Sequence, residues 1–184
     1  MAAASDIRFK ARVLRPAQPA GADWCFFVLP PAASKRLPSR SQVSVAGTLA
    51  DAPFQATLEP DGAGGHWMKV AAPLLAAAGV GPGATVALQM APLAEEPEPE
   101  VPDDLARALA DHPQARATWD DITPRARRDW VQWVTSGKKA ETRIKRLAVA
   151  CDKLASGQRR ACCFDRSGMY SKEFSAPRPA ADQG

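Results

Sequence analysis

The fold of the C-terminal half is decided by one stretch of sequence, Ser136-Gly137-Lys138-Lys139-Ala140-Glu141-Thr142-Arg143-Ile144-Lys145-Arg146-Leu147. Gly137 separates two segments in which apolar residues recur at helical spacing, so the stretch predicts a joint between two helices. Gly137 is expected to close the first of them as a C-terminal cap. Five of the twelve residues are lysine or arginine, which makes the joint the most obvious surface for an anionic ligand.

Apolar spacing predicts four helices beyond residue 101. Their expected ranges are 102–112, 114–121, 124–136 and 139–156. In the last two of these segments apolar residues recur three or four positions apart and share one face of the helix. Thr123 is the expected N-cap of the third helix, with Pro124 at the first helical position.

The first half alternates apolar and polar residues between turn signals, which is typical of β-strands. Strands are expected at 7–14, 24–29, 42–49, 54–58, 66–71 and 84–90, with short helices at 32–37 and 73–78. Proline and glycine clusters bound these segments. Short strands of this kind favour a small, mostly closed β-barrel. The fold class is therefore α+β, with an N-terminal small β-barrel followed by a C-terminal all-α helical domain.

A proline-rich acidic segment divides the two halves. Residues 94–101 are too charged and too often broken by proline to fold alone, and they are expected to form a stiff, extended linker. The predicted organisation is a barrel domain at 1–93, the linker at 94–101, a helical domain at 102–174 and a disordered tail at 175–184.

Bulk composition favours a soluble globular protein. The chain has 184 residues, of which 46% are hydrophobic and 24% charged, and this balance excludes a wholly disordered chain. Residues 1–6 lack the cationic start and apolar core of a secretory signal. Apolar runs are too short to span a bilayer. We expect a cytoplasmic location without membrane insertion.

The four cysteines indicate neither a disulfide framework nor a metal centre. Cys25, Cys151 and the adjacent Cys162-Cys163 are irregularly spaced, whereas structural zinc needs about four ligands from spaced pairs. Buried free thiols are expected instead. A redox role for Cys162 and Cys163 stays a weaker hypothesis. No metal and no cofactor are expected.

The barrel half offers no clear catalytic set. Its acids lie beside turn residues, where carboxylates normally accept hydrogen bonds from backbone amides. His66 is the only histidine of this half, and no serine or cysteine has an evident partner in it. The glycine cluster at 62–65 lacks the strand-to-helix context and the lysine of a phosphate loop. An enzyme is therefore the third hypothesis, behind two binding functions.

Charge is distributed unevenly along the second half. Residues 95–121 contain nine acids and two bases, whereas residues 125–160 contain eleven bases and three acids. Two interpretations follow. In the favoured one, the acidic and basic segments face each other or simply solvate two surfaces. In the other, the basic segment is an anion-binding face.

Both halves resemble known bacterial families. The residues that carry the first resemblance are Pro102-Asp103-Asp104-Leu105, Ala117-Thr118-Trp119-Asp120, Thr123-Pro124-Arg125-Ala126-Arg127-Arg128-Asp129-Trp130-Val131-Gln132-Trp133-Val134 and Lys138-Lys139-Ala140-Glu141-Thr142-Arg143-Ile144. They resemble the bacteriocin-protection family, also called YdeI/OmpD-associated. Residues 45–49 and 54–58 resemble an uncharacterised barrel domain often fused to that family. The second resemblance implies a double-split-like β-barrel, a fold with some transcription-regulator relatives.

The sequence departs from these families at three turns. Asp51-Ala52 stands where the barrel family tends to have a glycine turn, and Gly83-Ala84 where glycine-aspartate is usual. Ser136-Gly137 precedes the lysines where the helical family usually keeps alanine. Neither family brings an established catalytic residue. The resemblance implies a stress-related or envelope-associated protective role in bacteria.

The leading functional hypothesis is a non-enzymatic cytoplasmic binding protein whose ligand or protein partner is anionic. The candidate contact residues share the helix joint and are Lys138, Lys139, Thr142, Arg143 and Arg146. The alternative for these cations is internal pairing, in which Glu141 pairs with Lys138 or Lys145, and Arg143 pairs with an acid of the first helices.

Nucleic-acid binding is the second functional hypothesis. It is motivated by the basic segment and by the fold relatives of the barrel. Against it, the basic helix lacks interleaved exposed aromatic residues and any recognisable base-reading module.

Overall fold

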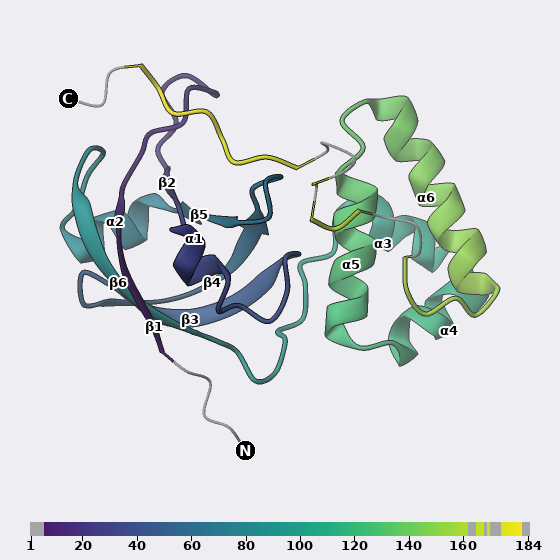
Figure 1. Cartoon of the computed structure of the whole chain (residues 1–184). Helices are drawn as coiled ribbons and strands as arrows, with labels where there is room; N and C mark the ends of the chain where they lie inside the picture. Colours follow the sequence, from purple (N-terminus) through teal and green to yellow (C-terminus); the bar gives the residue numbers. More distant parts are fainter. Residues whose placement is uncertain (1–5, 162–164, 168, 170–173, 182–184) are drawn as a thin grey trace. The chain divides into compact units, whose positions relative to one another are not determined.

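The computed structural model describes residues 6–161, 165–167, 169 and 174–181 (Figure 1). The described chain divides into two compact units. The first contains the residues up to Ala94 and those from Asp165 onward, and the second begins at Glu95. Each unit has its own hydrophobic core. The predicted α+β class is confirmed.

The first unit is built on one curled antiparallel sheet (Figure 1). The strands in its described part are β1 (Ile7–Arg12), β2 (Cys25–Val28), β3 (Val43–Leu49), β4 (Ala52–Pro60), β5 (His66–Val70) and β6 (Thr85–Pro92). They lie in the order β1-β6-β3-β4-β5-β2. Just after β1, Leu14 exchanges two backbone hydrogen bonds with Phe26 of β2, each 2.8 Å long. The two edge strands of the sheet are therefore joined at this point.

Alternation along the strands places the core on one side of the sheet. Ile7, Ala11 and Val13 are buried, as the period of two in the sequence predicts. The unbroken apolar run at residues 24–29 predicts a central strand that is covered on both faces. Phe26 and Phe27 are adjacent and both buried, which agrees with cover on both faces, but β2 lies at the end of the strand order and not at its centre.

Two short helices belong to the first unit, α1 (Pro31–Ser34) and α2 (Ala72–Ala78). Gly79 closes α2 in the left-handed conformation, with φ of 64°, as its position predicts. The turn between β3 and β4 contains two residues, Ala50 and Asp51, and both have positive φ, 44° and 69°. Positive φ at both positions is the pattern of a type I′ hairpin turn, which normally uses glycine or asparagine.

Helices are the regular elements in the described part of the second unit (Figure 1). They are α3 (Asp103–Ala110), α4 (Pro113–Asp121), α5 (Pro124–Thr135) and α6 (Ala140–Ala155). The Thr123 hydroxyl accepts a 3.3 Å hydrogen bond from the amide of Ala126, so the predicted N-cap of α5 is confirmed. Leu105, Trp130, Val134 and Leu154 lie in the core that the four helices share.

Gly137 differs from its predicted role. It is absent from the positive-φ glycines of the described residues. α5 ends at Thr135, and the φ and ψ of its C-cap residue, Ser136, remain right-handed. A Cβ at Gly137 would lie 3.3 Å from both the amide nitrogen of Arg143 and the Cγ2 of Thr142. The glycine therefore leaves room for the close approach of the joint to α6. The helix ends just before Gly137 as predicted, but not through the left-handed glycine cap that was expected.

The described residues after 164 belong with the first unit. Ala17 donates a 2.7 Å hydrogen bond to the Arg178 carbonyl, and Ala180 donates one of 2.9 Å to the Arg15 carbonyl. This pairing differs from the disordered tail that the sequence predicts at 175–184, because backbone groups at Arg15 and Ala17 supply partners that no local pattern reveals. The sequence also predicts that the aromatic residues Phe164, Tyr170 and Phe174 pack on the body of the protein. Of these, Phe164 and Tyr170 lie outside the described residues.

Candidate functional site

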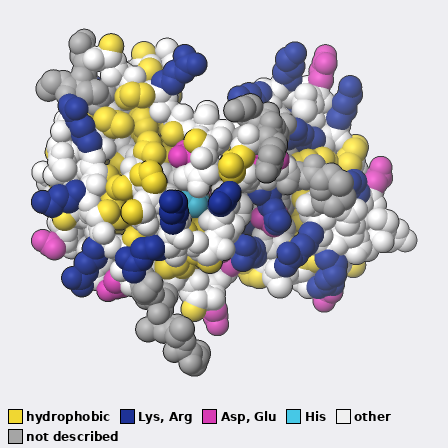
Figure 2. All heavy atoms as spheres, in the orientation of Figure 1, with side chains coloured by type: hydrophobic (Ala, Val, Ile, Leu, Met, Phe, Trp, Pro, Cys, Tyr) yellow, Lys and Arg dark blue, Asp and Glu magenta, His cyan; other side chains and the backbone are white. Residues whose placement is uncertain are grey.

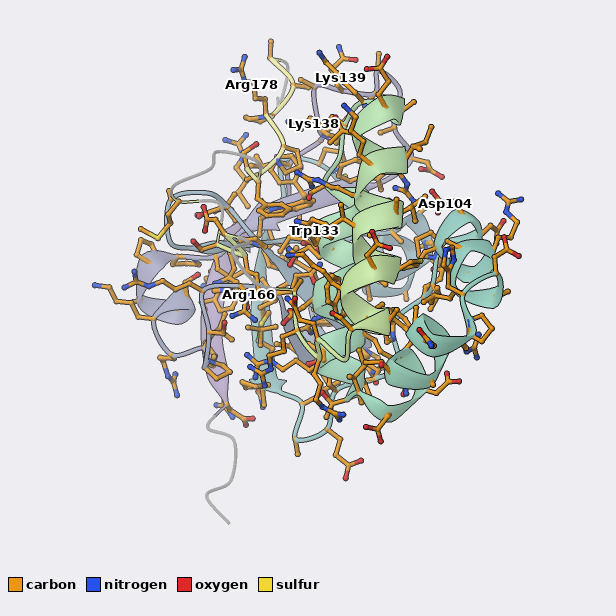
Figure 3. All side chains as sticks on the ribbon, turned by 90° about the vertical axis from the view of Figure 1, so that its right-hand side faces the viewer. Asp104, Trp133, Lys138, Lys139, Arg166 and Arg178 are labelled. Carbon is orange, nitrogen blue, oxygen red and sulfur yellow. The ribbon has the colours of Figure 1, made fainter. Side chains whose placement is uncertain are left out.

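The five predicted contact residues gather around the start of α6. Lys138 and Lys139 precede the helix and are exposed, whereas Thr142, Arg143 and Arg146 lie in its first two turns and are half-buried. Figure 3 shows both lysines at the N-terminal end of α6. The five residues therefore lie close together, but only the two lysines are exposed to solvent.

Arg143 is held by an acid of the first helix. Its Nε donates to Oδ2 of Asp104 at 2.6 Å, and its Nη2 donates to Oδ1 at 2.9 Å. This two-pronged geometry is the strong form of an arginine–carboxylate pair. The hydrogen bond from Arg143 lowers the pKa of Asp104. The alternative of internal pairing is thus confirmed for Arg143.

Arg146 is held at the end of α5. Its Nη1 donates to the Trp133 carbonyl at 2.7 Å and also to the Ser136 hydroxyl. Its guanidinium carbon lies 5.6 Å from the centroid of the Trp133 ring, in the range of a cation–π contact. The positive charge of Arg146 therefore lies against the carbonyl end of α5, where the helix dipole is negative.

Lys138 and Lys139 differ from the two arginines in their contacts. Among the residues that the structure describes, neither lysine has an ion-pair partner. Lys139 is the N-cap position of α6, and its side chain makes no capping hydrogen bond. The first amides of α6 consequently lack the side-chain acceptor that a serine or aspartate would provide. Two ammonium groups thus stand beside the positive end of a 16-residue helix.

Ion pairs join the acidic and basic segments of the second unit. Their members are Arg127 with Glu98, Arg128 with Glu96, Arg143 with Asp104, and Arg159 with Asp121. The favoured interpretation of the charge asymmetry is confirmed for these four pairs. The segment predicted to be a linker takes part in two of these pairs, since Glu96 and Glu98 contact arginines of α5.

The first unit contains a buried serine–histidine contact that the sequence did not indicate. His66 is fully buried, and its Nε2 lies 3.0 Å from the Ser41 carbonyl, to which it donates. Its Nδ1 is left to accept from the Ser34 hydroxyl at 3.3 Å, while the His66 amide donates to the same oxygen at 3.1 Å. Burial lowers the pKa of His66, so the ring stays neutral. The contact anchors α1 to β5 across 32 residues of sequence.

A pocket of about 710 Å³ lies in front of this contact. Ser34 forms part of its lining, together with Lys35, residues 37–40, the loop between β4 and β5, and Met169. On the face shown in Figure 2, basic side chains in dark blue lie on both sides of histidine atoms in cyan. No pattern in the sequence predicts this pocket, because its walls come from segments that are distant in sequence, within 29–40 and 61–65 and at Met169.

The thiols of the described residues are buried and reduced. Cys25 and Cys151 are both free, as expected, and burial raises the pKa of each thiol. Cys162 and Cys163 lie outside the described residues, and so does their hypothesised redox role. In the described part of the chain, no three histidine, cysteine, aspartate or glutamate side chains gather as a metal site would require. No helix within the described ranges has the length and apolarity to cross a membrane.

The fold and the site define a two-part chain, a curled antiparallel sheet followed by helices that present a basic joint. Residues 98–157 match the family model described as bacteriocin-protection, YdeI or OmpD-associated, and residues 9–90 match a domain of unknown function, DUF1905. These two matches agree with the resemblance that the sequence shows in each half. No curated protein matches the chain.

Proposed function

We propose that the chain is a non-enzymatic cytoplasmic binding protein that acts in stress or bacteriocin tolerance. Its ligand or partner segment presents phosphate or carboxylate groups to the joint between α5 and α6. The description of the helical family, bacteriocin protection, supports the role in tolerance. The same proposal includes the finer fold, a double-split-like barrel followed by an all-α domain. The link between Leu14 and Phe26 at the sheet edges supports the barrel.

One observation carries the proposed site. Lys138 and Lys139 are exposed and stand at the N-terminal end of α6, where a positive charge is disfavoured by about 0.3–1 kcal/mol. The carbonyl end of α5 does not offset this cost, because Arg146 already donates to the Trp133 carbonyl. A bound anion would pair with both ammonium groups and accept from the free amides of the first turn. Arg143 and Arg146 position the joint and do not contact the ligand.

Glu141 is the internal competitor for this anion. It lies in the first turn of α6 and is exposed, a position where a carboxylate interacts favourably with the helix dipole. In the described part of the chain it has no ion pair with Lys138 or Lys145. A Glu141→Gln variant should therefore bind an anion more tightly than the parent chain does.

The test is an anisotropy titration of the full chain with a fluorescein-labelled decaglutamate peptide at 50 and 200 mM salt. The proposal expects saturable binding that weakens at the higher salt and that is lost in the Lys138→Glu/Lys139→Glu double variant. The matched control is Arg125→Glu/Lys145→Glu, which changes the net charge equally at two other exposed cations. Equal loss in both double variants would reject the joint as the site.

The same titration includes the alternative, nucleic-acid binding, through labelled duplex and single-stranded DNA. Four arginines of the basic segment are occupied by carboxylates, which leaves fewer cations for phosphate contacts. DNA binding that is tighter than peptide binding and falls steeply with salt would favour the alternative.

A further inference from the structure

The pocket beside α1 has the size and the mixed lining of a small-molecule site. Its volume of about 710 Å³ falls within the range of pockets that hold drug-sized ligands. Leu29, Leu37 and Pro38 give it an apolar wall, while Lys35 and Arg40 stand at the same pocket. Its lining residues belong to the first unit, whereas the basic joint belongs to the second.

The loop that forms one wall is fixed by its own hydrogen bonds. Oδ1 of Asp61 accepts from the amides of Ala63 and Gly65, each at 2.8 Å. Gly64 has φ of 91°, in the left-handed region that favours glycine. A Cβ at Gly65 would lie 2.5 Å from Oδ2 of Asp61. These constraints present bare backbone to the pocket and keep the Asp61 carboxylate engaged with the loop.

The opposite wall is anchored by the buried histidine. Ser34 is 6% exposed, and its hydroxyl group makes two hydrogen bonds to His66, one with the backbone amide and one with the ring. The adjacent Lys35 and the following turn are thereby fixed relative to β5. A pocket with both walls held in place needs little ordering when a ligand binds, which favours affinity.

The two cations at the pocket are available for a ligand. Within the described ranges of the chain, Lys35 has no ion pair, and Arg40 donates only to the Met169 sulfur at 3.8 Å, a weak contact. Both side chains are exposed. Ammonium and guanidinium groups are the usual partners of phosphate and carboxylate. An apolar wall beside them matches a ligand that is charged at one end only.

We propose that this pocket binds a small molecule that carries a phosphate or carboxylate group on an apolar body. Lys35 and Arg40 hold the anionic group, and Leu29, Leu37 and Pro38 contact the body. The site extends the proposed function to a second ligand and does not depend on the basic joint.

The test is calorimetric titration of the full chain with four probes: hexyl phosphate, hexanoate, hexanol and inorganic phosphate. The proposal expects hexyl phosphate or hexanoate to bind at least tenfold more tightly than either hexanol or inorganic phosphate. Whichever of these two probes binds more tightly identifies the anionic group that the pocket prefers, phosphate or carboxylate. Absence of heat with both amphiphiles, or equal binding of hexanol, would overturn the proposal.

A variant pair locates the binding. Lys35→Ala/Arg40→Ala should weaken the preferred probe at least tenfold, whereas Arg36→Ala/Lys10→Ala should leave it unchanged, since Arg36 and Lys10 are exposed cations outside this pocket. Equal weakening in both variants would contradict the assignment. Amide shifts of the unmutated protein give a second readout, and they should concentrate at residues 34–40 and 61–65. Shifts centred at residues 138–142 would place the probe at the basic joint and overturn the proposal.

Discussion

Arg143 on α6 and Asp104 on α3 form a bidentate ion pair, with nitrogen–oxygen distances of 2.6 and 2.9 Å. The two residues are 39 positions apart in sequence, and their side chains are 27% and 32% exposed. Together with the bonds from Arg146 to α5, this pair fixes the start of α6. The cations of the joint therefore have two roles: Arg143 and Arg146 hold the helices, and Lys138 and Lys139 face solvent.

Asp104→Asn should lower the free energy of unfolding of the helical unit by about 1 kcal/mol at pH 6, since it removes a partly exposed ion pair of good geometry. Urea unfolding followed by tryptophan fluorescence measures the change. Asp103→Asn is the matched control, because Asp103 is exposed in the same first turn and has no such partner among the described residues. A larger loss in the control would contradict the assigned role of Asp104.

The same pair predicts a pH dependence. The bond from Arg143 lowers the pKa of Asp104 in the folded state, so its stabilising contribution is complete above the ordinary aspartate value of about 3.9. It is lost as pH falls through the lowered pKa. The difference between the parent chain and Asp104→Asn should accordingly shrink between pH 6 and pH 3. A difference that grows toward acid pH would contradict this sign.

Gly137→Ala should destabilise the helical unit by about 1 kcal/mol or more. The added methyl would lie 3.3 Å from the backbone nitrogen of Arg143, and this helix backbone is held by the Asp104 pair and cannot easily move aside. Thermal unfolding measures the loss. Gly81→Ala serves as the control, because a Cβ there meets nothing within 4 Å and should change stability by less than about 0.5 kcal/mol.

Ala50→Gly should stabilise the first unit. Ala50 has φ of 44°, and a left-handed conformation costs a non-glycine residue about 1–2 kcal/mol. Removal of the Cβ relieves that strain, and the larger entropy of glycine in the unfolded chain offsets part of the gain. Urea midpoints should rise for Ala50→Gly and fall for Ala87→Gly, where an exposed strand residue has ordinary backbone geometry. A lower midpoint for Ala50→Gly would reject the strained turn.

His66 predicts acid sensitivity of the first unit. Burial lowers its folded-state pKa, so below the ordinary histidine value of about 6.5 the unfolded chain binds a proton that the folded chain does not. Stability should therefore decrease as pH falls from 7 toward 5. An NMR titration of the His66 ring provides the direct readout: its shift should not respond near pH 6.5. A normal titration there would contradict the buried neutral ring.

Local chemistry explains which features could be predicted from sequence. The caps formed by Thr123 on α5 and by Gly79 on α2 could be predicted, because each depends on hydrogen bonds to residues only a few positions away. The strands followed from alternation, and the burial of Phe26 and Phe27 from an unbroken apolar run. The expectation that Arg143 pairs with an acid of the first helices was correct, although it did not specify Asp104. It was possible because the charge asymmetry is visible in the sequence.

Features set by packing between distant segments could not be predicted. Ser34 and His66 are in contact because β5 places the histidine beside the end of α1. Nothing in the sequence around either residue indicates that the other will be its partner. The role of Gly137 was misjudged for a similar reason. A glycine after a helix usually indicates a left-handed cap, whereas here it leaves room for the close approach of Arg143 and Thr142. The pairing of Ala180 with Arg15 likewise depends on the tertiary fold.

The most direct test of the basic joint is an amide NMR titration of the full chain with sodium tripolyphosphate at 100 mM salt. We expect saturable shifts that are largest at residues 138–142, where two lysines and the first amides of α6 meet. These shifts should be abolished in Lys138→Glu/Lys139→Glu and retained in Arg125→Glu/Lys145→Glu. Shifts of equal size across all basic residues, or shifts that survive reversal of both lysines, would show that Lys138 and Lys139 do not form an anion-binding site.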